Sequence, residues 1–347
     1  MSLSPNATIW LYAHPTMEKL AEKIMRRVTE VEDAEEKFQE DIGKPHITQG
    51  QEVPRRKIEL KKSIRWKTFP DGFPNLFIEE VKTMAGKDVI FLGSFHSAEV
   101  IFEQLSIVYA LPRYLARSLT FILPYFPTAT MERVEMEGEI ATAKTLSTML
   151  SCIPLCSRGP PHIMVFDIHA LQERFYFGNS VIPRLETAIP LLQREVQSLP
   201  DHQNISIAFP DDGAHKRFHR MFDKMNTIIC VKVREGDKRV IRIKDGNPKD
   251  QHVVIVDDLV MTGGTLKECG KALMNQGAKC ISAYVTHAVF PSDSWKKFTQ
   301  SDVKFENFWI TDSMPHANDI AKHEPFRLLS ICDVIADSLL GYDLLQN

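Results

Sequence analysis

The sequence is poor in cysteine, lacks long apolar runs and carries little net charge, and each absence excludes a class of protein. Six cysteines in 347 residues, none with CxxC spacing, are too few for a disulfide scaffold or a cysteine-rich zinc site. No stretch approaches the roughly 20 apolar residues that a membrane-spanning helix needs. The 42 Lys and Arg against 45 Asp and Glu give a net charge of −3, which argues against a protein that works mainly by neutralising nucleic-acid phosphates.

Targeting signals are also missing. The N-terminal segment has no basic stretch before its short apolar run, so it does not resemble a signal peptide. The C-terminal residues match no retention or peroxisomal signal. We therefore expect a reduced, cytoplasmic protein with no nucleic-acid and no membrane partner. With 44% apolar and 25% charged residues, the composition is that of a globular protein, and the length suggests two domains.

Short apolar segments alternate with segments of helical periodicity along the chain. The expected strands are 8–12, 88–92, 119–123, 163–166, 205–209, 227–231, 253–256, 281–285 and 308–311. The expected helices include 98–110, 140–150, 183–197, 265–275 and 331–340. Continuously apolar strands that alternate with helices are typical of parallel sheets covered on both faces. The pattern therefore predicts an α/β fold.

The number of strands fits two such sheets, with the change from one to the other near residues 165–185. We set the first domain at 1–175 and the second at 176–330, and we expect a C-terminal helix at 331–343 that can pack back on the first domain. Residues 29–61 are charged, poor in apolar residues and contain two prolines. This segment predicts a solvated helical extension followed by a surface loop.

The segment 253–266, VVIVDDLVMTGGTL, is an apolar strand that ends in two acids and leads through two glycines into a helix. Gly263 and Gly264 allow positive φ and close backbone approach. The start of the helix offers unpaired N–H groups and the positive end of a dipole. Together these features favour a phosphate monoester, with Asp257 and Asp258 placed to accept hydrogen bonds from a neighbouring sugar. The alternative is a tight turn with capping carboxylates.

Two further strand ends carry ionisable side chains. Asp167 and His169 follow the strand 163–166, and Asp211 follows the strand 205–209 in the turn PDDG. Taken singly, such a histidine and such a carboxylate are more often structural than functional. If the two strand ends are neighbours, however, an imidazole and a carboxylate face one crevice. That arrangement suits Mg²⁺ bound to a triphosphate.

A basic stretch and two aromatic segments complete the set of candidates. Residues 231–243 form an expected strand and turn in which Lys232 and Arg234 share one face. A basic stretch is often only a solvated face, but cations on a flap also stabilise charge during phosphoryl transfer. The turn at 68–77 could stack a purine between aromatic side chains. Residues 123–133 form an apolar strand that enters a proline-bearing loop.

In this order, six of these strings resemble the ribose-phosphate diphosphokinase family, also called phosphoribosyl pyrophosphate synthetases. The family strings are a Phe-x-Asp-Gly turn, Pro-Tyr-Phe-Pro, an Asp-Leu-His-Ala segment, Pro-Asp-x-Gly, Lys-x-Arg and the ribose-phosphate loop. They lie here at 69–72, 124–127, 167–170, 210–213, 232–234 and 257–265, and the likeness covers roughly residues 65–340.

The resemblance implies two phosphoribosyltransferase-like (type I) domains, each a largely parallel sheet flanked by helices. It also implies a reaction. The diphosphoryl group of Mg-ATP would pass to the anomeric hydroxyl of ribose 5-phosphate and give 5-phosphoribosyl 1-diphosphate (PRPP) and AMP, for nucleotide biosynthesis. Members of the family complete the nucleotide site across a subunit interface, so the resemblance further implies a homo-oligomer.

The resemblance assigns roles to individual residues. It makes Lys232 and Arg234 the catalytic cations, and it makes His169 and Asp211 the metal contacts, with Mg²⁺ as the cofactor. The nucleotide site would consist of Phe69, Asp71, Arg133 and His169. The ribose 5-phosphate site would consist of Asp257, Asp258, Thr262, Gly263, Gly264 and Thr265.

Departures from the common form of the family resemble its plant-type class II branch. Thr130 and Met131 stand where the common form has an Arg-Gln pair. Met261 replaces an acid just before Thr262 of the ribose-phosphate loop. Ala214 replaces a glycine, and Phe73 replaces a glutamate. The resemblance therefore implies an enzyme that is independent of phosphate activation and less selective for its diphosphoryl donor.

Two other functions stay open on the sequence. A non-catalytic synthetase-associated subunit would keep the fold without the activity. The retained His169, Asp211 and Lys232 argue against that function, whereas the changed residues keep it open. A phosphoribosyltransferase that consumes PRPP would share the ribose-phosphate loop, but it would not explain the segments at 124–127 and 167–170.

Overall fold

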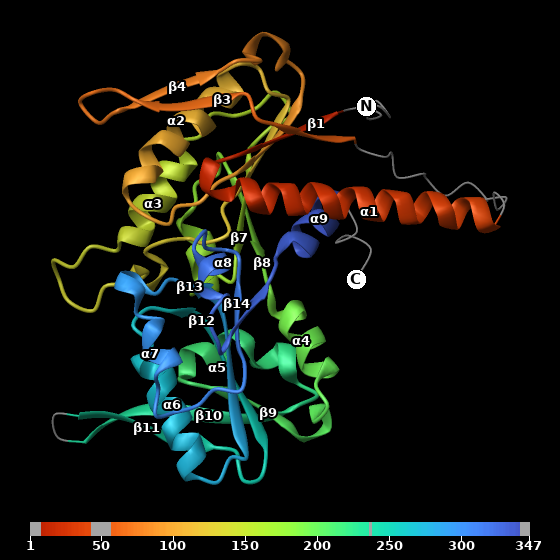
Figure 1. Cartoon of the computed structure of the whole chain (residues 1–347). Helices are drawn as coiled ribbons and strands as arrows, with labels where there is room; N and C mark the ends of the chain where they lie inside the picture. The colour runs from red at the N-terminus through yellow and green to blue at the C-terminus, as the bar shows by residue number, and fades with distance from the viewer. Residues whose placement is uncertain (1–7, 43–56, 236–237, 341–347) are drawn as a thin grey trace.

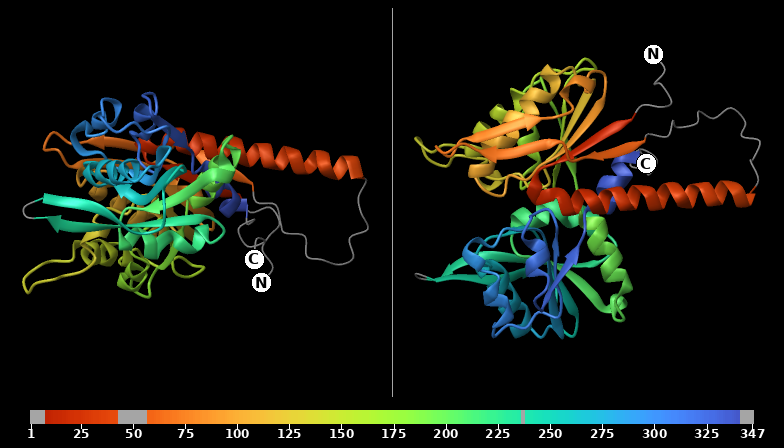
Figure 2. Two further views of the ribbon diagram at one scale, coloured as in Figure 1. Left: turned by 90° about the horizontal axis from the view of Figure 1, so that it is seen from below. Right: turned by 45° about the horizontal axis from the view of Figure 1, so that its top comes forward.

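The computed structural model describes residues 8–42, 57–235 and 238–340, and it shows two halves of strands and helices, one above the other (Figure 1). The upper half is built on a six-stranded sheet and the lower half on a seven-stranded sheet. Helix α1 (Glu18–Ile42) crosses between the halves, and its far end projects from the body (Figure 2). The predicted α/β fold is confirmed.

All neighbouring strands of the first sheet are parallel, in the order β2-β1-β5-β6-β7-β8. Their bounds are β1 Ile9–Ala13, β2 Ile58–Lys61, β5 Asp88–Leu92, β6 Ser118–Ile122, β7 His162–Phe166 and β8 Ile182–Glu186. Alternate side chains of a strand point to opposite faces, and both faces are apolar here. Helices α2 (Glu99–Arg113) and α3 (Thr142–Ser151) cover one face, and α1 covers the other.

The second sheet has the order β11-β10-β9-β12-β13-β14-β15, and only its edge pair β10–β11 is antiparallel. Its strands are β9 Ile205–Phe209, β10 Asn226–Glu235, β11 Lys238–Asp245, β12 His252–Val260, β13 Cys280–Ala288, β14 Phe308–Thr311 and β15 Phe326–Leu329. Its helices are α4 Ile189–Ser198, α5 Asp212–Phe218, α6 Gly264–Asn275, α7 Lys296–Thr299 and α8 Ala317–Ile320, while α9 Cys332–Leu340 follows β15 and packs against α1. The hairpin of β3 (Ile64–Thr68) and β4 (Pro74–Ile78) stands apart from both sheets.

One apolar cluster joins the two halves. It contains Leu11 and Phe166 from the first sheet, Ile207 and Val256 from the second, and side chains of α1, α4 and α9 that lie between them. Helix α9 lies beside α1, where Arg27 forms an ion pair with Asp333. Burial of apolar surface is the main favourable contribution to folding, so the shared cluster holds the halves together.

Local departures from the predicted elements have clear causes. The helix expected over 183–197 begins only at Ile189, because residues 182–186 pair with β7 as strand β8. The first sheet therefore continues past residue 175, and the division of the chain at 175 stays a prediction. Helix α1 ends at Ile42, in agreement with the expected helical extension, while most of the loop expected after it lies outside the described residues.

The carboxyl ends of β7 and β13 are bonded to each other across the two sheets. Asp167 is fully buried with a φ of +34°, and its carboxylate accepts hydrogen bonds from Thr187 Oγ1 (2.6 Å), Ala188 N (2.9 Å) and Thr286 Oγ1 (2.7 Å). His287 Nε2 lies 3.0 Å from the carbonyl oxygen of Phe166. These bonds place the ends of the two sheets side by side, and the candidate site lies there.

Candidate functional site

Residues from both sheets meet at these strand ends, where the sequence predicts a crevice, and we refer to this region by that name. His169, which follows β7, places its Nδ1 2.7 Å from Oδ2 of Asp258 on β12. The backbone N–H of Asp258 donates to Oδ1 of Asp257 at 3.0 Å. The residue expected at the metal site is thus in direct contact with a residue expected at the ribose site.

The charges in this crevice depend on one another. The hydrogen bond that His169 donates to Asp258 raises the pKa of His169 despite the burial of the ring. Burial opposes ionisation of Asp258, but its contact with His169 outweighs that effect and lowers the pKa of Asp258. Burial, together with the charges of Asp258 and Asp211, raises the pKa of Asp257 well above its usual range. The crevice therefore concentrates carboxyl groups that a divalent cation would stabilise in their ionised form.

Asp211 has two roles in the structure. Its Oδ1 accepts hydrogen bonds from the backbone N–H groups of Gly213 and Ala214, each at 3.0 Å, and so caps α5. Its Oδ2 lies 2.8 Å from Nζ of Lys232 on β10. Burial opposes ionisation, but the bond to Lys232 lowers the pKa of Asp211. Arg234 lies two residues further along β10, and its side chain is outside the described part of the structure.

The glycine turn before α6 leaves open space beside the helix start. Gly263 has a φ of +78° and its ideal Cβ would lie 2.4 Å from the Phe298 ring, so no side chain fits there. A Cβ at Gly264 would meet only Thr262 Oγ1, at 4.0 Å. Thr262 is exposed and Thr265 is half-buried. Since the first N–H groups of a helix have no intrahelical partner, the turn can bind a phosphate group.

Alanine substitution is expected to affect stability at Gly263 and substrate binding at Gly264. We expect Gly263→Ala to lower the free energy of unfolding by about 1–3 kcal/mol, because the methyl group strains the backbone and meets the Phe298 ring. Gly264→Ala should leave stability within about 0.5 kcal/mol but raise KM for ribose 5-phosphate about tenfold, since the methyl group intrudes on the phosphate position. Urea unfolding and initial rates measure the two effects. An unchanged KM in Gly264→Ala would contradict the assignment of the turn.

Glu173 belongs to this region and was not among the predicted site residues. It lies in the 3₁₀ helix Leu171–Tyr176 after β7 and is fully buried. Its Oε1 accepts a hydrogen bond from the N–H of Ala170 at 3.0 Å, while its Oε2 has no partner among the described residues. Burial raises its pKa from 4.5 to about 7, and the charges of Glu132 and Asp258 add to the effect.

The raised pKa of Glu173 makes stability depend on pH. A carboxyl group whose pKa is higher in the folded state favours folding below its unfolded pKa, and this contribution is lost as pH rises through the folded pKa. We therefore expect Glu173→Gln to stabilise the protein by about 1–3 kcal/mol at pH 8 and by little at pH 4.5. Urea unfolding at both pH values tests this, with Glu135→Gln, at an exposed position, as the matched control. Equal effects at both pH values would contradict the shift.

Three residues expected at the nucleotide site lie apart from the crevice. Phe69 and Asp71 are in the turn of the β3–β4 hairpin, far from β12 and β13 in Figure 1. Phe69 is 48% exposed, and Asp71 accepts a hydrogen bond from the backbone of Phe73. Arg133 is exposed and lies 3.7 Å from both Glu132 and Glu135. The described contacts do not bring any of the three to His169.

Comparison with known proteins identifies the family. Residues 9–153 match the N-terminal domain of ribose phosphate pyrophosphokinase, and residues 181–319 match the phosphoribosyl transferase domain. Ribose-phosphate pyrophosphokinase 4 of rice is 54% identical over 283 residues, which cover 80% of this chain and 87% of that protein. The chain belongs to the ribose-phosphate pyrophosphokinase family. Because relatives at 52–55% identity carry this name, the predicted ribose-phosphate diphosphokinase, an enzyme that makes PRPP, is confirmed, and the non-catalytic subunit is not favoured.

Further relatives of this chain agree. The Arabidopsis thaliana protein of the same name is 52% identical, over 80% of this chain and 84% of its own length. Phosphoribosylpyrophosphate synthetase from Mycobacterium smegmatis has a TM-score of 0.76 at 20% identity, over 97% of this chain and 99% of its own. This structure confirms the predicted pair of phosphoribosyltransferase-like domains. The plant relatives are 52–55% identical and the bacterial ones 25–28%, as the resemblance to the plant-type branch predicted.

The comparisons leave the cellular compartment of this chain open. In the part of the chain that the structure describes, no helix is long and apolar enough to cross a bilayer. Relatives include a chloroplastic protein from rice and a mitochondrial one from Spinacia oleracea. The expected cytoplasmic location is therefore not confirmed and stays a prediction.

Proposed function

We propose that this chain transfers the diphosphoryl group of Mg-ATP to the anomeric hydroxyl of ribose 5-phosphate, in the crevice between its two sheets. One observation carries the proposal. The contact of His169 with Asp258 joins the expected nucleotide side of the crevice to the expected ribose side. The glycine turn of α6 follows Asp258 along the chain, and Lys232 reaches the same crevice from β10 through Asp211. Donor and acceptor sites are thus adjacent, as a direct transfer requires.

The residues present fit a magnesium ion. Mg²⁺ prefers oxygen ligands and retains water and substrate phosphates in an octahedral shell. Asp211 offers Oδ2, and His169 offers Nε2 because its Nδ1 is bonded to Asp258. When bound, the cation would neutralise phosphate charge and so make the diphosphoryl group easier to transfer.

Lys232 supplies the positive charge from the flap strands β10 and β11. Its ammonium group is bonded to Asp211 Oδ2, the oxygen that we assign to the metal. Once this oxygen has another partner, Lys232 is released and can turn toward the phosphates of ATP. Arg234, two residues further along the strand, would act with it. A cation beside the transferring group stabilises charge that develops in the transition state.

The ribose phosphate would lie along the end of β12 and the start of α6. The N–H groups beside Gly263, Gly264 and Thr265 would bind the 5-phosphate, with the hydroxyl of Thr262 beside them. Asp257 and Asp258 would accept hydrogen bonds from the sugar hydroxyls. Because His169 already fixes one oxygen of Asp258, this carboxylate is oriented before the substrate arrives.

The adenine site requires a second copy of the chain. Phe69 and Asp71 lie on a hairpin that projects from the body, and the neighbouring Phe73 is 63% exposed. We propose that this hairpin covers the nucleotide of a neighbouring subunit in a homo-oligomer. Arg133 stays proposed as a further nucleotide contact.

A direct assay tests the reaction. The purified protein is incubated with ribose 5-phosphate, ATP and Mg²⁺ in phosphate-free buffer, and the nucleotides are then separated by chromatography. We expect AMP to form in proportion to PRPP. ADP in place of AMP would contradict diphosphoryl transfer. Activity that appears only after addition of inorganic phosphate would keep the reaction but contradict the phosphate independence implied by the plant-type branch.

A further inference from the structure

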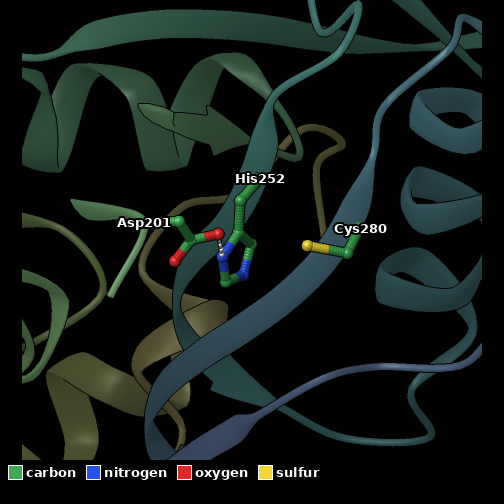
Figure 3. A group of neighbouring side chains, drawn as sticks. All are labelled: Asp201, His252 and Cys280. Carbon is green, nitrogen blue, oxygen red and sulfur yellow. Dashed lines mark hydrogen bonds and ion pairs between the residues drawn. The ribbon is translucent and has the colours of Figure 1, made fainter. Parts of the chain in front are cut away.

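A second group of side chains that can bind a metal lies where the central strands of the second sheet begin, at the end of these strands that is opposite to the crevice. His252 begins β12, Cys280 begins β13, and the two are register partners in this parallel pair. Asp201 lies in the turn before β9. Figure 3 shows the imidazole of His252 between the Asp201 carboxylate and the Cys280 thiol. The ligand atoms of the three side chains lie within 4.8 Å of one another.

The hydrogen bonds of His252 distinguish its two ring nitrogens: Nδ1 faces Asp201, and Nε2 is bonded to a serine. Oδ2 of Asp201 is 3.0 Å from Nδ1 of His252, and the opposite nitrogen, Nε2, is 2.8 Å from Oγ of Ser282. The backbone N–H of Asn307 also donates to this Oγ at 3.2 Å. In metal sites, the second ring nitrogen of a histidine ligand is generally bonded to a fixed polar group that orients the ring. Ser282 occupies that position here.

The electric field at the cluster favours a cation. Burial raises the pKa of the Cys280 thiol, and the negative charges of Asp201 and Glu306 raise it further, against a smaller opposite effect of Lys279. A divalent cation would reverse this effect, since it stabilises the thiolate directly. The site is also accessible, because the side chain of Asp201 is 31% exposed and Cys280 is half-buried.

We propose that Asp201, His252 and Cys280 bind a zinc ion through Oδ2, Nδ1 and Sγ. Sulfur, imidazole and carboxylate ligands are the set that zinc prefers, whereas a thiolate does not suit magnesium. A tetrahedral zinc with bonds of about 2.0–2.3 Å holds its ligand atoms roughly 3.3–3.8 Å apart. Because the His252 ring lies between the other two side chains, the ring must turn and Cys280 must move toward Asp201 when the ion binds. Water from the exposed side completes the coordination. The ion connects the turn before β9 to β12 and β13, and so stabilises this edge of the sheet.

Without a metal, the same groups would satisfy both ring nitrogens of His252 by hydrogen bonds, as for a purely structural histidine. In that arrangement Nδ1–H donates to Asp201 and Ser282 Oγ–H donates to Nε2. The two arrangements differ in protons. Zinc binding moves the ring proton from Nδ1 to Nε2 and displaces the thiol proton of Cys280 into solution. We therefore expect release of about one proton per zinc ion, which calorimetry in buffers of different ionisation enthalpy measures.

Cobalt(II) spectroscopy tests which side chains bind. The full-length protein is stripped with a chelator, kept in excess Mg²⁺ so that the crevice is occupied, and titrated with Co²⁺. We expect a thiolate-to-cobalt charge-transfer band that stoichiometric Zn²⁺ removes. The band should be lost in Cys280→Ser and retained in Cys152→Ser, the matched control at an exposed thiol. Zinc affinity should fall at least about tenfold in Cys280→Ser.

Other outcomes would overturn the proposal. Absence of the band in the native chain would leave the metal-free histidine as the correct arrangement. A band that survives in Cys280→Ser but disappears in Cys230→Ser would place the metal at the buried thiol pair Cys230 and Cys269, whose sulfurs are 3.6 Å apart. Zinc should raise the melting temperature of the native chain and of Cys152→Ser but not of Cys280→Ser. AMP formation should be equal in all three, because the cluster is remote from the crevice.

Discussion

Replacing Lys232 with alanine is expected to lower kcat by about 100-fold or more, with little change in KM for ribose 5-phosphate. The Lys232 ammonium lies 2.8 Å from Asp211 Oδ2, so it is held within reach of the phosphates that Asp211 and its cation would bind. Without Lys232, the negative charge that develops on the diphosphoryl group during transfer would lose the cation that β10 holds beside Asp211. The turn on α6 that would bind the 5-phosphate is not altered. Initial rates of AMP formation at varied substrate concentrations measure both constants.

The neighbouring pair provides a close control. Lys244 on β11 lies 3.1 Å from Asp212, the residue after Asp211. Lys244→Ala removes the same charge and the same kind of ion pair, but from a side chain that is 55% exposed. We expect its kcat to stay within about twofold of the native value. A Lys232→Ala enzyme within a few-fold of native would contradict the catalytic assignment. Equal losses in both variants would mean that only the net charge of the flap matters.

Replacing His169 is expected to impair both sides of the crevice. In His169→Ala, Asp258 keeps a buried carboxylate with no partner from the first sheet, and the nucleotide side loses the ring Nε2. We expect kcat/KM for Mg-ATP to fall by about 100-fold or more. We also expect KM for ribose 5-phosphate to rise, since an unpaired buried charge is poorly placed and its pKa moves upward. Steady-state kinetics with each substrate varied in turn separates the two effects.

His169→Asn separates the two functions of the ring. The asparagine Nδ2 occupies nearly the position of the histidine Nδ1, so it can still donate a hydrogen bond to Asp258, but it has no group in place of Nε2. We expect KM for ribose 5-phosphate to return to within about threefold of native while kcat/KM for Mg-ATP stays low. His202→Ala, at the opposite edge of the sheet, should resemble the native enzyme. Native Mg-ATP kinetics in His169→Asn would exclude Nε2 as a ligand.

The sequence predicted most of the elements because the signals for them are local. The apolar strands, the two acids of β12 and the glycine turn each lie within a few consecutive residues. The sequence predicts a helix over most of strand β8, because residues 183–197 carry apolar side chains at helical spacing. A local signal for the later start is Pro190, which lies in the first turn of α4. Only the pairing with β7, a contact between distant segments, makes residues 182–186 a strand.

The contacts of the site were harder to predict. The contact of His169 with Asp258 joins residues 89 positions apart, and it exists because the two sheets share a core. Glu173 was missed because a glutamate in the stretch LQERFY is indistinguishable from a solvent-exposed one. The three-residue spacing from Ala170 was no signal either, because the alanine methyl group accepts no hydrogen bond and cannot complete a capping box; only the bond from the Ala170 N–H to Glu173 forms. Burial of that carboxylate follows from the packing of the whole half.

The apolar cluster that joins the two sheets also limits how the enzyme can choose its donor. Packed interiors resist continuous deformation, so the two rims of the crevice keep a fixed separation instead of closing around each substrate. With the sites proposed above, this separation would fix how far the donor phosphates at His169 lie from the ribose 5-phosphate at the α6 turn, whatever base the donor carries at its far end. Discrimination between bases would then depend on the exposed hairpin, which lies outside the shared apolar cluster.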